Sequence, residues 1–79
     1  MALDTKIREV LKEYDTGTIY RLNIQRTDFR QICAQVTIQA LDDSDPSFAV
    51  RESIQRLQNY GFTIVHGPVG QKRTFIVCQ

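Results

Sequence analysis

The side chains best suited to chemistry in this sequence lie in its second half, in the segment PSFAVRESIQRLQNY. Arg51 and Gln55 are four residues apart, so on a helix they would share one face. Arginine can bind guanine, and glutamine adenine, through paired hydrogen bonds. Residues 46–60 are therefore predicted to form a helix whose exposed face can enter the major groove of DNA. The alternative interpretation is an ordinary polar helix face.

Further side chains could hold the sugar–phosphate backbone of a duplex. Ser47 stands at the expected start of the helix, where hydroxyls and backbone N–H groups bind phosphate. The run GPVGQKR reads as a turn with a cationic tip, although such a tip can also serve only solubility. The candidate DNA-binding residues are Ser47, Arg51, Gln55, Arg56, Gln71, Lys72 and Arg73.

Phe48 does not fit a DNA-facing role, because it is an aromatic residue on the polar side of the same helix. Such a residue more often packs against the protein itself or against a partner protein. Phe48 is therefore the candidate residue for a protein interface.

No set of residues suggests catalysis. The sequence has a single histidine, no His/Cys cluster and no glycine-rich loop after a strand, so neither an enzyme, a metal site nor a cofactor is expected.

Cys33 and Cys78 are interpreted as two small apolar residues, with a disulfide as the alternative. The N-terminal segment has no apolar signal region, and no run reaches transmembrane length, so a cytoplasmic location without membrane contact is expected.

Length and net charge further limit the fold and the function that the chain can have. A chain of 79 residues is expected to be one domain over 1–79, and 42% hydrophobic and 24% charged residues are ordinary for a folded protein. The net charge of +1 counts against nucleic-acid binding, because phosphate neutralisation supplies much of the affinity. Within residues 46–79, however, arginine and lysine outnumber the single acid, Glu52.

Five elements follow from periodicity and from helix and turn signals. Asp45 and Pro46 suit the start of the central helix, and Gly61 suits its end. The predicted elements are a helix over 3–14, a strand over 18–25, a helix over 46–60 and strands over 62–66 and 74–78.

Residues 27–41 fit both periods. The β-branched run Val36-Thr37-Ile38 favours a strand. The absence of glycine or Asn-Gly where a hairpin would turn, at 26–29, favours a helix, and the helix is the preferred interpretation.

The pattern S-x-x-V-R-E-S-I-Q-R-L-Q-x-x-G-F, followed by G-Q-K-R-T-F-I-V, resembles the recognition helix and wing of gluconate-repressor-type and biotin-repressor-type regulators over residues 47–77. The resemblance implies an α+β winged helix, in the order helix-strand-helix-helix-strand-strand with a three-stranded sheet. It also implies a small regulator or accessory factor that binds double-stranded DNA, for which a homodimer is expected. The alternative is an α-ββ-α-ββ sandwich that serves as a protein-interaction module or inhibitor and never touches DNA.

Overall fold

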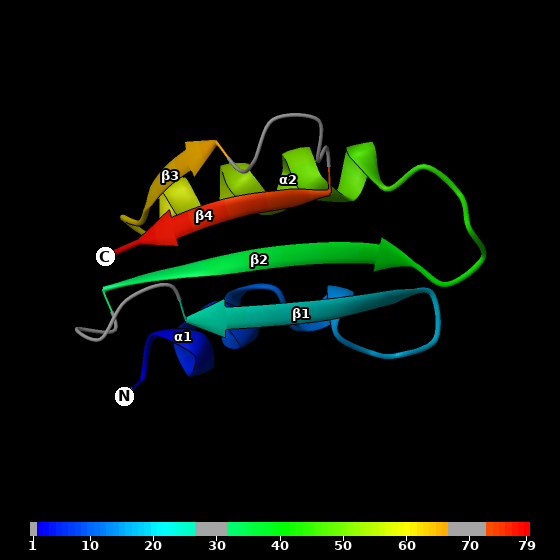
Figure 1. Cartoon of the computed structure of the whole chain (residues 1–79), viewed down its shortest axis with the longest axis horizontal. Coiled ribbons are helices and arrows are strands. Elements are labelled where there is room, and N and C mark those ends of the chain that lie inside the picture. Colours follow the sequence, from blue (N-terminus) through cyan, green and yellow to red (C-terminus); the bar gives the residue numbers. More distant parts are fainter. Residues whose placement is uncertain (1, 27–31, 67–72) are drawn as a thin grey trace.

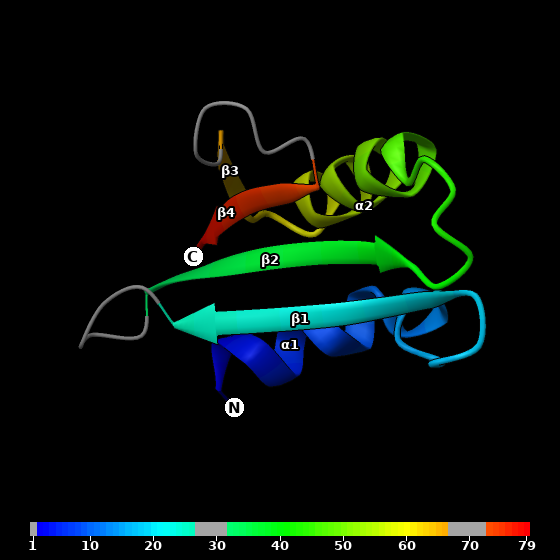
Figure 2. The same ribbon diagram turned by 45° about the vertical axis from the view of Figure 1, so that its right-hand side comes forward.

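A computed structural model of the chain describes residues 2–26, 32–66 and 73–79. In these ranges two helices lie on one face of a four-stranded antiparallel sheet (Figure 1 and Figure 2). The elements in chain order are α1 (Leu3–Val10), a 3₁₀ turn (Lys12–Tyr14), β1 (Tyr20–Arg26), β2 (Cys33–Ala40), α2 (Ser47–Asn59), β3 (Thr63–His66) and β4 (Thr74–Cys78).

The sheet has the order β1-β2-β4-β3, so each helix is followed in sequence by two strands that pair with each other. The two pairs meet at a central seam between β2 and β4. There Cys33 lies opposite Cys78 and Thr37 opposite Thr74. Strands β1 and β3 form the two edges (Figure 1).

The core lies between the helices and one face of the sheet. Alternate residues of β2 are buried because successive side chains of a strand point to opposite faces. The largest fully buried side chains are those of Ile7, Leu11, Ile38, Leu57, Val36, Val77 and Ser53. The buried side of each helix therefore faces the sheet.

The prediction of a helix over 27–41 is wrong for residues 33–40, which form β2. The strand period places Ala34, Val36, Ile38 and Ala40 on the covered face, and all four are buried. The β-branched run favours this strand, and pairing with strands on both sides stabilises it. Residues 27–31 lie outside the described ranges.

Two further expectations change with that strand. The sheet has four strands rather than three, and β1 pairs with β2 rather than with the terminal hairpin. Because residues 33–40 are a strand, no helix from that segment packs beside α2 as a helix-turn-helix requires. The winged helix is not confirmed, whereas the alternative element order, α-ββ-α-ββ, is the observed one.

The ends of α2 follow their predicted signals. The Asp45 carboxylate accepts hydrogen bonds from the Ser47 N–H at 3.0 Å and from its hydroxyl at 2.6 Å. At the other end, Gly61 has φ of 93°, a conformation that glycine adopts at little cost. The Gly61 N–H donates to the Gln58 carbonyl and the Phe62 N–H to the Leu57 carbonyl, both at 3.0 Å, which is the Schellman pattern.

Cys33 and Cys78 form a disulfide across the central seam. They are therefore not the two unpaired small apolar residues of the preferred interpretation. The alternative interpretation was therefore the right one. The bond joins residues 45 positions apart in sequence, so it closes a ring that contains β2, α2, β3 and β4.

Candidate functional site

The candidate DNA-binding residues of α2 lie in different environments. Arg51 and Gln55 are exposed, and the Gln55 amide donates a hydrogen bond to the Asn59 side chain at 3.3 Å. Ser47 is half-buried, and its hydroxyl donates to Asp45. Two exposed polar side chains therefore share this face, but the Ser47 hydroxyl proton is already engaged.

Arg56 belongs to a different environment. Its guanidinium forms ion pairs with Glu13 and with Glu52, the latter at 2.6 Å. The guanidinium carbon also lies 5.6 Å from the centre of the Tyr14 ring, within the range of a cation–π contact. A cation with these partners ties the 3₁₀ turn to α2, so Arg56 has a structural role that sequence reasoning missed.

Tyr14 also contacts the residues that surround Arg56. Its hydroxyl donates to the Glu52 carboxylate at 2.6 Å, and its ring meets that of Tyr20 edge-on, 5.3 Å away. Burial, followed by the hydrogen bond to Glu52, raises the pKa of the Tyr14 hydroxyl well above its usual range. The neutral phenol is therefore the form that the folded chain holds.

Arg73 is the one residue of the predicted wing, 67–73, that lies in the described ranges. Arg73 is exposed and directly precedes β4. Gln71 and Lys72 lie outside the described ranges. Phe48 is 66% exposed, so it does not pack into the core and remains open to a partner.

The largest feature that sequence reasoning missed is the outer face of the sheet, on the side away from both helices (Figure 1 and Figure 2). The strand registers place the odd-numbered residues of β1, β2 and β3 together with the even-numbered residues of β4 on this face. We call it the open sheet face. Its described side chains are Arg21, Asn23, Gln25, Cys33, Gln35, Thr37, Gln39, Thr63, Val65, Thr74, Ile76 and Cys78.

Only Arg21 carries a charge among these described side chains. The helical layer is different, since its two helices and 3₁₀ turn carry Asp4, Lys6, Arg8, Glu9, Lys12, Glu13, Arg51, Glu52 and Arg56. Charge is thus segregated between the two sides of the molecule. The alternation within each strand was visible in the sequence, but the registers were needed to show that these positions form one surface.

The open sheet face also has an apolar area. Val65 is 47% exposed and lies opposite Ile76 in the β3–β4 register. The Cys33–Cys78 disulfide lies two residues further along the seam. At the other end of the seam, the Thr37 and Thr74 hydroxyls hydrogen-bond to each other at 3.0 Å, so these polar groups are partly satisfied within the sheet.

Metal ligands and membrane-spanning helices can be assessed for the part of the chain that the structure describes. It contains no group of three His, Cys, Asp or Glu side chains that could hold a metal ion. None of its helices combines the length and the apolar character needed to cross a bilayer.

Comparisons with protein-family models, with curated proteins and with solved structures found no match to this chain.

Proposed function

We propose that this chain is a protein-interaction domain that packs the open sheet face against another protein. The observation that carries the proposal is the near absence of charge from that face, while the helical side of the same molecule is rich in charge. Charged residues are depleted at the centre of protein interfaces, because removing them from water is costly.

The remaining chemistry of the face suits the same role. Val65, Ile76 and the disulfide supply apolar area near the β3–β4 pair. Asn23, Gln25 and Gln39 are exposed and supply neutral hydrogen-bonding groups on the other side of the seam. If the partner surface is also uncharged, binding removes few charged groups from water and so costs little desolvation energy. Hydrogen bonds between polar groups of the two proteins would then determine the orientation of the partner.

DNA binding remains a prediction that no observation tests. Arg51 and Gln55 keep an exposed face on α2, which supports it. The pairing of Arg56 with two carboxylates and the strand at residues 33–40 reduce the support that the sequence offered.

A photocrosslinking experiment in cells of the source organism compares the two faces. A photoreactive residue replaces Gln35 on the open sheet face or, as a matched control, Gln55 on α2. We expect a discrete protein adduct from position 35 and none from position 55. The adduct should disappear when Ile76→Arg is added, because a charge would then be buried in the contact. It should persist with Arg51→Ala.

Equal adducts from both positions, or none from position 35, would refute the proposal. Duplex DNA is tested in parallel by a salt titration of fluorescence anisotropy, since phosphate contacts make binding salt-dependent. Salt-sensitive binding that Arg51→Ala weakens and Ile76→Arg leaves unchanged would favour the DNA function instead. Circular dichroism of each variant checks that the fold is kept.

A further inference from the structure

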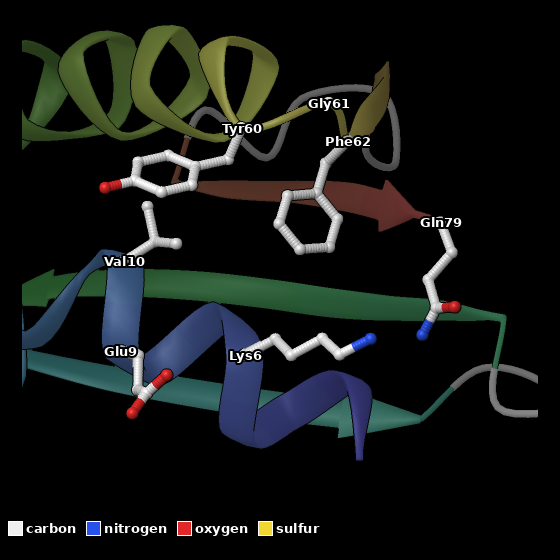
Figure 3. Close-up of a pocket in the computed structure, with 7 residues that line it drawn as sticks. All are labelled: Lys6, Glu9, Val10, Tyr60, Gly61, Phe62 and Gln79. Carbon is white, nitrogen blue, oxygen red and sulfur yellow. The ribbon is translucent and has the colours of Figure 1, made fainter. Parts of the chain in front are cut away.

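A groove of about 500 Å³ lies on the helical side of the molecule, opposite the open sheet face. Its lining comes from α1, from the residues that follow α2, and from the residue after β4 (Figure 3). The lining residues are Lys6, Glu9, Val10, Tyr60, Gly61, Phe62 and Gln79. The volume falls within the range of sites that hold small molecules.

The middle of the groove is apolar and aromatic. Figure 3 shows the Tyr60 ring above Val10, with the Phe62 ring beside them and pointing toward α1. Tyr60 is 73% exposed, so its ring has a large area that the described residues leave uncovered. The Schellman turn at Gly61 determines this geometry, because it reverses the chain between the two aromatic residues.

One end of the groove is cationic. The Lys6 side chain extends along α1 toward the Gln79 amide (Figure 3). Lys6 is half-buried and has no carboxylate within 4.0 Å in the described part of the chain. Glu9 belongs to the same helix, but its carboxylate points away from both aromatic rings and from the Lys6 ammonium.

We propose that this groove binds a small aromatic monocarboxylate, with its ring against Tyr60 and Phe62 and its carboxylate on Lys6 and Gln79. The ammonium and the amide N–H groups can donate to the two oxygens of one carboxylate. A dianion such as phosphate fits less well, because the lining carries one lysine and one glutamate and so has no net positive charge. The proposal does not depend on the function proposed for the open sheet face.

The test uses 3-phenylpropionate and its neutral analogue 3-phenylpropionamide, titrated to about 10 mM, since a ligand of this size binds weakly. Backbone amide shifts in heteronuclear NMR spectra map the binding site. Saturable shifts are expected at Lys6, Val10, Gly61, Phe62 and Gln79 with the carboxylate, and much smaller shifts with the amide. Absence of saturable shifts, equal shifts with the amide, or shifts that map to the open sheet face would each overturn the proposal.

Three variants separate the contributions of charge and ring. Lys6→Gln should weaken binding of the carboxylate about fivefold, the upper range for a partly exposed ion pair. Tyr60→Ala should weaken it by up to about tenfold through loss of the ring contact. Lys12→Gln, which removes an exposed lysine of the 3₁₀ turn outside the groove, should leave the affinity unchanged. Equal effects of Lys6→Gln and Lys12→Gln would show only a general electrostatic attraction and would refute the site.

Discussion

Reduction of the Cys33–Cys78 disulfide should destabilise this domain by as much as a large-to-small substitution in its core. The bond closes a ring of 45 residues. In the chain-entropy description, the entropy that such a ring removes from the unfolded state amounts to about 13 cal/mol/K, or about 4 kcal/mol at 25 °C. A domain of this length has a total stability of only about 4–12 kcal/mol.

The expected loss is therefore between about a third and the whole of the stability, and it corresponds to a fall in melting temperature of roughly 15–30 °C. Urea and thermal unfolding followed by circular dichroism should show this difference between the oxidised chain and the chain kept in excess dithiol. The variant Cys33→Ala/Cys78→Ala is the control, since reductant should not change its midpoint and its stability should resemble that of the reduced chain.

A difference below about 1 kcal/mol between oxidised and reduced protein would refute the reasoning, because the ring would then not constrain the unfolded chain as assumed. A midpoint of the double variant that still responds to dithiol would refute it in another way, by showing that the reductant acts elsewhere.

Three smaller predictions concern α2 and the turn before β1. Gly61→Ala should lower the free energy of unfolding by about 1–2 kcal/mol in urea titrations, because a Cβ at Gly61 meets nothing within 4 Å and the cost is that of a left-handed backbone alone; a larger loss would point to a clash. Ser53→Ala should raise that free energy by about 1 kcal/mol, since the fully buried Ser53 hydroxyl has no hydrogen-bond partner in the described structure; a loss would mean that the hydroxyl is satisfied. Above about pH 10 the unfolded chain loses its tyrosine protons while Tyr14 in the folded chain keeps its own, so unfolding should become easier as the pH rises. Tyr14→Phe should reduce this pH dependence in parallel titrations of the two proteins, and unchanged slopes would contradict the role of its hydrogen bond to Glu52.

Local signals in the sequence were sufficient for most elements. Asp45, Pro46 and Gly61 indicated the two ends of α2, and the helix found there buries Val50 and Leu57. The β-branched and aromatic residues of β3 and β4 identified the final hairpin. These signals depend on neighbours along the chain, so a sequence contains them directly.

Residues 33–40 could not be assigned in this way, because their apolar positions fit both a helix and a strand. Pairing with β1 on one side and with β4 on the other decides between them. The second of these contacts joins Cys33 to Cys78, which are distant in sequence. The open sheet face and the groove could not be predicted for the same reason, since both combine residues from segments that meet only in the folded chain.

The disulfide is also relevant to the cellular compartment of the protein. Disulfides persist mainly in oxidising compartments and are rare in reducing cytoplasm. The predicted cytoplasmic location is not confirmed, and a stable bond between Cys33 and Cys78 would be unusual there.

The sheet order has a consequence for assembly. A helix followed by two paired strands occurs twice, and β2 and β4 meet antiparallel at the centre, so the two halves are related by an approximate twofold axis through the seam. An antiparallel seam of this kind can also form between halves of two different chains, through exchange of an identical element. Residues 41–46, which join the halves, would be the hinge of such an exchange. The exchanged dimer would then be covalent, because each Cys33 would bond to Cys78 of the other chain, and a reductant would separate it on a denaturing gel.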